Sequence, residues 1–178
     1  MTRSQSRLVV LLAAAVCMAT ACASTRTQKS AGEQIDDTVV TAQVKAALIG
    51  DPVTKARNID VEVFKGRVQL NGFVDSAAER SQAATVAGRV SAVDNNLKLK
   101  VAERTAGTVI DDATISGTVK AKLAEDNRTK AHQINVETRN GVVLLGGFVS
   151  SAAERSAATE IAGTVAGVKS VDNKIALK

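Results

Sequence analysis

The chain has 178 residues and a formal net charge of +5, from 23 lysines and arginines against 18 aspartates and glutamates. This length suits one ordinary domain or two very small ones. Its only aromatic residues are three phenylalanines, which excludes the stacking platforms that bind single-stranded nucleic acid. One histidine and two cysteines are too few for the His and Cys clusters that hold structural metals, so we expect no metal or other cofactor.

The N-terminus has the layout of a bacterial secretory signal peptide. Arg3 and Arg7 form a positive segment, and residues 8–16 form an apolar run that is too short to span a bilayer. Small residues follow, and residues 19–22 (Ala-Thr-Ala-Cys) resemble a lipobox, the site where bacterial lipoproteins are lipidated on cysteine and cleaved before it. Removal of residues 1–21 lowers the net charge to +3.

Cys22 is therefore the predicted lipid-attachment residue, and residues 22–34 are a predicted polar tether. Cys17 and Cys22 are the only cysteines, so the processed chain has no partner for an intramolecular disulfide, and lipidation explains the remaining thiol. By resemblance to enterobacterial lipoproteins, Ala23 in place of Asp favours the outer membrane. The alternative is an ordinary signal peptide, cut after Ala21 or Ala23, with a soluble periplasmic product.

The rest of the chain repeats itself at an offset of 75 residues. More than half of the positions from 35 to 90 are identical in the second copy, and residues 76–81 recur unchanged as 151–156. Near the end of each copy the offset becomes 78 residues, because the first copy lacks three residues. Such a dense match indicates a duplicated domain. We predict domains at residues 35–101 and 110–178, joined by a linker at 102–109.

Each copy begins with a predicted amphipathic helix. Its apolar residues are spaced by four, so they share one helical face. They are Val40, Val44 and Leu48 in the first copy, and Ile115, Val119 and Leu123 in the second. An Asp pair just ahead, Asp36-Asp37 or Asp111-Asp112, is expected to cap this helix.

A predicted β-hairpin follows in each copy. Apolar and polar residues alternate on both sides of a turn that contains Gly66 in the first copy and Asn140-Gly141 in the second. Gly72 and Gly147 are expected to mark a bulge or a close approach of the backbone. Phe73 and Phe148 interrupt the expected alternation, so we interpret them as core residues displaced by a bulge. The alternative is partial exposure, which would make them available to a partner.

A second helix and a closing strand complete each copy. The predicted helix caps are capping boxes, Ser76 with Glu79 and Ser151 with Glu154, and the helices extend to about Val90 and Val165. The closing strand is expected at Leu97, Leu99 and Val101, and at Ile175 and Leu177. The predicted fold is α+β, with the order α-β-β-α-β, a three-stranded mixed sheet and two helices. The sequence leaves open whether the two domains pack together.

Together these motifs resemble the BON domain. The resemblance rests on the Asp pair, the Val-x-Leu-x-Gly strand at residues 68–72, the Ser-x-x-Glu box and the Val-Asp-Asn at 171–173. It covers both copies and implies a non-enzymatic envelope protein. Secreted proteins with two BON domains form two groups. One is soluble and osmotically induced in the periplasm. The other is lipid-anchored, associates with anionic phospholipid and supports outer-membrane integrity. Cys22 favours the second group.

In the lipid-anchored group the second BON domain binds lipid. The second copy here carries four basic residues along and just after its first helix, which are Lys120, Lys122, Arg128 and Lys130. They are candidate contacts for phospholipid headgroups, since a basic helix is attracted to an anionic bilayer. The alternative is a solvated helix face, because Glu125 and Asp126 lie among them.

We expect no catalytic site. His132 has Arg57 as its counterpart in the other copy, and adjacent Asp residues do not face each other on a helix. The expected partners are anionic phospholipids or the outer membrane, and not nucleic acid. The competing hypothesis is an adaptor or chaperone-like protein that binds an envelope protein.

Overall fold

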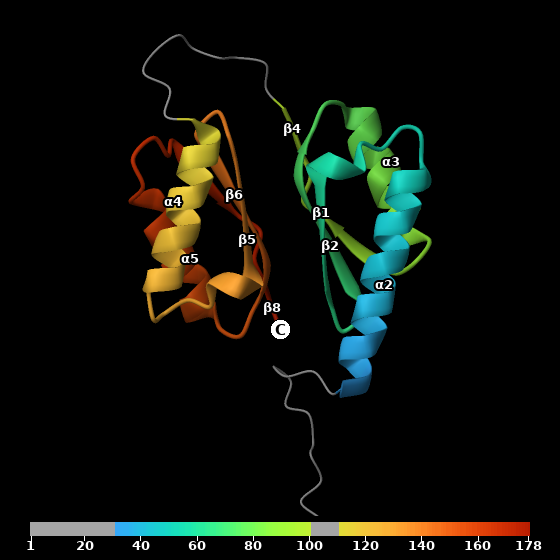
Figure 1. Cartoon of the computed structure of the whole chain (residues 1–178), viewed down its shortest axis with the longest axis horizontal. Coiled ribbons are helices and arrows are strands. Elements are labelled where there is room, and N and C mark those ends of the chain that lie inside the picture. Colours follow the sequence, from blue (N-terminus) through green and yellow to red (C-terminus); the bar gives the residue numbers. More distant parts are fainter. Residues whose placement is uncertain (1–30, 101–110) are drawn as a thin grey trace, which may run out of the picture.

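The computed structural model describes residues 31–100 and 111–178, which form two α+β domains with the predicted order of elements (Figure 1). The first domain comprises α2 (Ala31–Gly50), η1 (Ala56–Asn58), β1 (Ile59–Phe64), β2 (Arg67–Val74), α3 (Ala77–Gly88), β3 (Ala92–Asn95) and β4 (Lys98–Leu99). The second comprises α4 (Asp112–Glu125), η2 (Ala131–Gln133), β5 (Ile134–Arg139), β6 (Val142–Val149), α5 (Ala152–Gly163), β7 (Ser170–Asn173) and β8 (Ala176–Leu177). The helices α3 and α5 end at glycines, two residues earlier than expected.

The sheet of each domain is mixed. In the first domain β2 is the central strand, antiparallel to β1 and parallel to both β3 and β4. The third strand therefore begins at Ala92, earlier than the expected start at Leu97, and is interrupted between β3 and β4. The side chain of Asn95 accepts a hydrogen bond from the Leu97 N–H at 3.1 Å, and Leu97 is buried in the core. The second domain repeats this arrangement with β5 to β8.

The Asp pairs serve only in part as the expected helix caps. Helix α2 starts at Ala31, so Asp36 and Asp37 lie inside it, and the expectation that they cap it is wrong. Only in the second domain does the pair contribute a cap, because the Asp111 carboxylate accepts a hydrogen bond from the Ala113 N–H. The second Asp of each pair, Asp37 or Asp112, binds the hairpin turn of its own domain.

The hairpin turns are held by these carboxylates. Lys65 and Gly66 both have positive φ, at 50° and 75°, as a type I′ turn requires. The two carboxylate oxygens of Asp37 accept hydrogen bonds from the Lys65 and Gly66 N–H groups, both at 2.8 Å. Asp112 binds the corresponding turn of the second domain in the same way. Each first helix is thereby tied to its hairpin.

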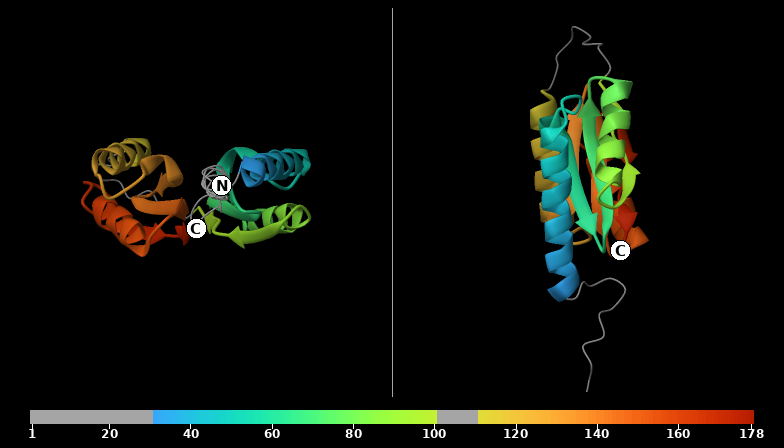
Figure 2. Two further views of the ribbon diagram at one scale, coloured as in Figure 1. Left: turned by 90° about the horizontal axis from the view of Figure 1, so that it is seen from below. Right: turned by 90° about the vertical axis from the view of Figure 1, so that its right-hand side faces the viewer.

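The helices cover one face of each sheet and enclose a separate apolar core in each domain. The first core contains Val44 and Leu48 of α2, Val68 and Leu70 of β2, and Leu97. The other faces of the two sheets are turned toward each other, so the molecule has the layers helices, sheet, sheet, helices (Figure 2). The question left open by the sequence is thus resolved, because the two domains pack together.

The strand β2 shows how one strand serves two interfaces. Its residues Val68, Leu70 and Val74 face the helices, whereas Gln69, Asn71 and Phe73 lie on the face turned to the second domain. Gln69 and Asn71 are only 1% and 2% exposed. The pairing with β1 runs without a bulge through Gly72, where a Cβ would collide with the Asn58 carbonyl oxygen. Of the two alternatives for Gly72, the close backbone approach is confirmed.

The phenylalanines are therefore not displaced core residues, and that interpretation is wrong. Phe73 and Phe148 occupy the domain-facing side of β2 and β6, outside both apolar cores. Phe148 stacks on Phe64 of the first domain, with ring centroids 5.5 Å apart. The alternation of each strand is intact, and its second face is buried by the neighbouring domain.

Candidate functional site

The predicted headgroup contacts lie on α4 and on the loop that follows it. Helix α4 buries Ile115, Val119 and Leu123 against its sheet, and this leaves Lys120 and Lys122 exposed on its outer surface. Arg128 and Lys130 are exposed in the loop before η2. This loop lies at the same end of the molecule as the start of α2 (Figure 1). The predicted lipid attachment at Cys22 and the linker at 102–109 fall outside the described residues.

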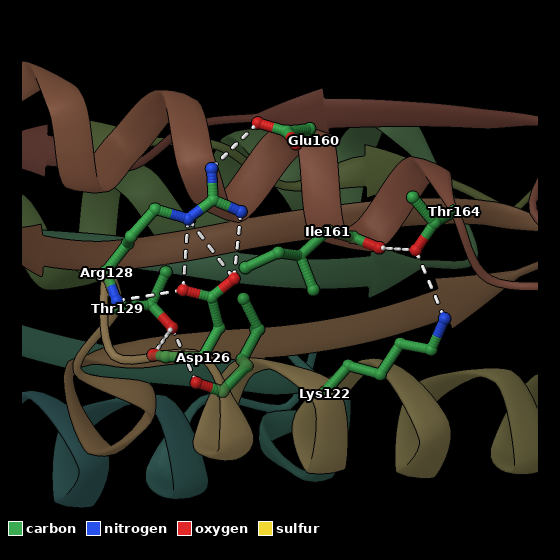
Figure 3. Close-up of polar contacts among 8 residues, drawn as sticks. Lys122, Asp126, Arg128, Thr129, Glu160, Ile161 and Thr164 are labelled. Atoms are coloured by element: carbon green, nitrogen blue, oxygen red, sulfur yellow. Dashed lines mark hydrogen bonds and ion pairs between the residues drawn. The ribbon is translucent and has the colours of Figure 1, made fainter.

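Arg128 is held by two carboxylates. Its Nε and Nη2 donate to the Asp126 carboxylate at 3.1 and 2.8 Å, and its Nη1 donates to Glu160 of α5 at 3.1 Å (Figure 3). The side-chain hydrogen bond with Arg128 lowers the pKa of Asp126, and the same contact raises the pKa of Arg128. Two acidic groups thus offset the charge of this arginine, which is the weakest of the four candidates for binding an anion.

None of the three lysines forms an ion pair with a described residue. The Lys122 Nζ donates to the Thr164 hydroxyl at 3.2 Å, which orients the side chain toward the end of α5 (Figure 3). Lys120 lies on the other side of α4, where its charge partly opposes the rise in the pKa of Glu137 on β5 that burial and Asp60 cause. The four basic residues consequently do not form one cluster, but line both sides of α4 and the loop beyond it.

Lys130 differs from its counterpart in the first domain. Lys55 pairs with Asp75 at 2.5 Å, and hydrogen bonds from Lys100 and Lys55 lower the pKa of Asp75 to about 2. In the second domain Ser150 replaces Asp75, so Lys130 has no ion-pair partner within the described part of the chain. Among the described residues, Lys130 therefore lacks the carboxylate that pairs with its counterpart Lys55.

The Ser-x-x-Glu boxes anchor the start of the second helix to the rest of each domain. The Ser76 hydroxyl accepts a hydrogen bond from the Glu79 N–H at 3.1 Å. The buried Glu79 carboxylate accepts from the N–H groups of Asp75 and Lys55, at 2.9 and 3.0 Å. Ser151 and Glu154 repeat these contacts with Ser150 and Lys130. These residues serve the fold.

A polar contact between the domains was missed at the sequence level. Gln69 accepts a hydrogen bond from the Gly147 N–H at 2.9 Å, and its amide donates to the Lys174 carbonyl at 3.3 Å. The Asn135 amide donates to the Asp60 carboxylate at 2.6 Å. Asp60 and Asn135 occupy equivalent positions in the repeat, so the two domains meet across an approximate twofold axis. The sequence did contain a signal for this contact, because the two copies differ at strand positions that point away from the helices.

The interface also contains a half-buried acidic pair, Asp60 and Glu137. Burial, together with the charge and hydrogen bonding of Asp60, raises the pKa of Glu137 to about 7, although Lys120 and Lys100 act in the opposite direction. Glu137 therefore titrates near neutral pH at the contact between the domains. Its proton occupancy is expected to affect how firmly the domains are held.

Other candidate chemistry is sparse. His132 is exposed on η2, where its ring lies 3.3 Å from the Gln133 side-chain amide. Across residues 31–100 and 111–178, no three His, Cys, Asp or Glu side chains are grouped as metal ligands. Over the same ranges no helix is both long enough and apolar enough to cross a bilayer.

Comparison with known proteins agrees with the repeat and the fold. In an alignment of 193 positions, the chain is 36% identical to osmotically-inducible protein Y of Escherichia coli, and the alignment covers 98% of this chain and 96% of that protein. It is 32% identical to the outer membrane lipoprotein DolP of Haemophilus influenzae and to a 21 kDa hemolysin of Actinobacillus pleuropneumoniae. Each of these matches extends over 146 residues, 80% of this chain and 75% of the relative.

Both halves of the structure also match one family of domains. The match covers residues 36–101 and 111–178, which contain the two sheets and their helices apart from the start of α2. The chain belongs to the BON domain family and carries two BON domains in tandem.

Proposed function

We propose that this chain is a non-enzymatic, lipid-anchored envelope protein that binds anionic phospholipid membrane and supports outer-membrane integrity or stress tolerance. The observation that carries the proposal is a set of exposed lysines that form no ion pair with a described residue, namely Lys120 and Lys122 on α4 and Lys130 in the loop after it. An anionic bilayer attracts each such cation by about 1 kcal/mol.

The placement of these lysines supports membrane contact. The loop after α4 lies at the end of the molecule where α2 begins, and the predicted tether from Cys22 leads into α2 (Figure 1). A lipid on Cys22 would therefore bring this end of the second domain close to the bilayer. The similarity to an outer membrane lipoprotein is consistent with this orientation.

The surface formed by Lys120, Lys122 and Lys130, here called the lysine surface, is tested by comparing matched double variants. Lys120→Gln/Lys130→Gln removes two of the cations, and Lys45→Gln/Lys55→Gln removes their equivalents from the first domain. Sedimentation with phosphatidylglycerol vesicles should show roughly 30-fold weaker binding for the first variant only, as expected for about 2 kcal/mol. Equal binding by both variants and the unsubstituted protein would refute a role for this surface.

The anchor is tested separately. Membrane fractionation and mass spectrometry of the unsubstituted chain should show a diacylglyceryl-modified Cys22 in the outer-membrane fraction. The Cys22→Ala variant should be soluble in the periplasm. An unmodified, soluble unsubstituted protein would remove the anchor from the proposal.

The alternative function is a soluble periplasmic adaptor or chaperone-like protein. It is favoured by the similarity to osmotically-inducible protein Y across nearly the whole chain. In that case cross-linking in cells should capture a specific envelope protein, and Lys120→Gln/Lys130→Gln should leave the capture unchanged. Loss of capture in this variant would instead indicate that binding depends on the lysine surface.

A further inference from the structure

One end of the domain interface is filled with aromatic side chains and the other end is open. At the filled end Phe64 of β1 stacks on Phe148, and the Arg67 guanidinium lies 5.9 Å from the Phe148 ring. The repeat places Phe73 at the position equivalent to Phe148, but opposite it Arg139 replaces Phe64 and Val142 replaces Arg67. The second stack therefore cannot form.

A groove of about 560 Å³ occupies the open end. It lies between β4 of the first domain and the β5–β6 hairpin of the second, with Phe73, Leu97, Leu99 and Val142 as its apolar lining. Leu99 is 40% exposed and adds accessible apolar surface to the groove. This volume is within the range of sites that bind small molecules.

All the charged residues that line the groove are basic. Arg80 and Lys98 come from the first domain, and Arg139 and Lys174 come from the second. Asp172 pairs with both lysines and so offsets at most one of the four charges. Neither Arg80 nor Arg139 forms an ion pair with a described residue. The groove consequently carries a net positive charge.

The Arg139 side chain has an unmet hydrogen-bonding requirement. Its Nε is buried and donates to no atom of the described residues. A buried donor without an acceptor is costly, commonly about 1–3 kcal/mol, so such groups usually have a partner. Arginine binds phosphate oxygens through charged hydrogen bonds, so an anion in the groove would give the Arg139 guanidinium an acceptor once the side chain turns toward it.

We propose that the groove binds a single-chain amphiphile with a phosphate head, which contacts Arg80 and Arg139 while the chain lies on Phe73 and Leu99. Several cations favour a multiply charged phosphate over a single carboxylate, and the adjacent apolar lining fits a hydrocarbon chain. The groove is distinct from the lysine surface of α4. Its ligand therefore does not depend on the membrane contact proposed above.

The test uses calorimetry on the chain from residue 22, with Cys22→Ser to prevent disulfide dimers. The probes are decyl phosphate, inorganic phosphate, decyl maltoside and decanoate, all in monomeric form. Decyl phosphate should bind at one site per chain, and each of the other probes about tenfold or more weakly, since each lacks the chain, the charge or the phosphate. The proposal would be overturned if either inorganic phosphate or decyl maltoside bound as tightly as decyl phosphate. Equal binding of decanoate would overturn the preference for phosphate.

Three variants locate the site. Arg139→Phe restores the residue of the first copy, so it should close the groove and weaken decyl phosphate binding at least about tenfold. Arg80→Gln alters an exposed side chain, so folding should be unaffected, and it should weaken binding about tenfold. The matched control Arg155→Gln, at the equivalent position of the second domain, should bind normally. Unchanged binding by both groove variants, or equal loss in the control, would overturn the assignment.

The same variants distinguish the groove from the lysine surface of α4. Lys120→Gln/Lys130→Gln should still bind decyl phosphate, and Arg80→Gln should still bind phosphatidylglycerol vesicles. Loss of decyl phosphate binding in the lysine variant would place the amphiphile on α4 and overturn the groove proposal. Failure of vesicle binding in the unsubstituted protein would refute the proposed function without affecting the groove.

Discussion

Asn71 and Gly146 occupy equivalent positions in the two copies and meet at the centre of the domain interface. A Cβ at position 146 would collide with the side-chain amide of Asn71. That amide is held in place because its oxygen accepts a hydrogen bond from Asn96 at 3.1 Å. Two asparagines could not be accommodated there, so one copy has to lack a side chain at this position.

Gly146→Asn should therefore loosen the contact between the domains. It restores the residue of the first copy, but overpacks a buried contact, which typically costs about 1–3 kcal/mol. Denaturant unfolding should show this loss, and small-angle scattering should show a larger radius of gyration. Gly163→Ala is the control, because a Cβ there meets nothing within 4 Å, and it should stay within about 0.5 kcal/mol of the unsubstituted protein. Unchanged scattering for Gly146→Asn would contradict the observed docking.

Stability should fall as the pH rises through neutrality. The pKa of Glu137 is raised to about 7 in the docked protein and returns toward 4.5 when the chain unfolds. The protonated carboxyl thus favours the docked state. This contribution is complete below about pH 4.5 and is lost as the pH passes 7. The free energy of unfolding, measured between pH 5 and 8, should decrease with pH.

Glu137→Gln should flatten this pH dependence, because the amide does not titrate. Glu62→Gln is the matched control at the exposed, equivalent position of the first domain, and should keep the slope. The carboxyl of Asp75, whose pKa is lowered to about 2, titrates well outside the measured window. A slope that persists in Glu137→Gln would show that another group is responsible.

The carboxylate of Asp37 should matter more than that of its neighbour. Asp37→Ala removes the acceptor for the turn N–H groups of Lys65 and Gly66, at a cost of about 2–3 kcal/mol for hydrogen bonds to a buried charge. Asp36 is exposed, so Asp36→Ala should change the free energy of unfolding by less than about 0.5 kcal/mol. Similar losses in both variants would indicate a general effect of charge on α2.

Glu79→Gln should destabilise the first domain although the side chain keeps its size. An amide has only one acceptor oxygen, so one of the N–H groups of Asp75 and Lys55 would face an NH₂ group in a buried position. We expect a loss of about 1–3 kcal/mol in thermal or denaturant unfolding. Glu125→Gln, on the exposed end of α4, should be nearly neutral. Equal stability of the two variants would argue against this anchoring role.

The helices, turns and order of elements in each domain could be predicted from the sequence, because patterns of neighbouring residues determine them. Val44 and Leu48 mark a helical face, Asn140-Gly141 favours a type I′ turn, and the fold class and element order follow from such signals. The Asp pair was misinterpreted because a capping residue and a residue that binds a turn 28 positions away have the same local pattern. Distinguishing them requires the tertiary structure.

The domain interface was unpredictable for a similar reason. Gln69 and Asn71 are polar residues at alternate strand positions, which ordinarily indicates a face exposed to solvent. Their burial depends on a second sheet that no local pattern encodes. The repeat nevertheless held a clue, since the copies differ at 64 and 139, at 69 and 144, and at 71 and 146, and these positions lie on or beside the contact.

The approximate twofold axis has a consequence for how such a protein can evolve. In a homodimer of a single BON domain, every substitution at the interface would appear twice, once at each end. Phe64 would then close both ends, or an arginine would open both, and an asparagine on the axis would always meet its own copy. Joining the two domains in one chain removes that constraint. One end can be optimised for cohesion while the other is free to acquire a ligand.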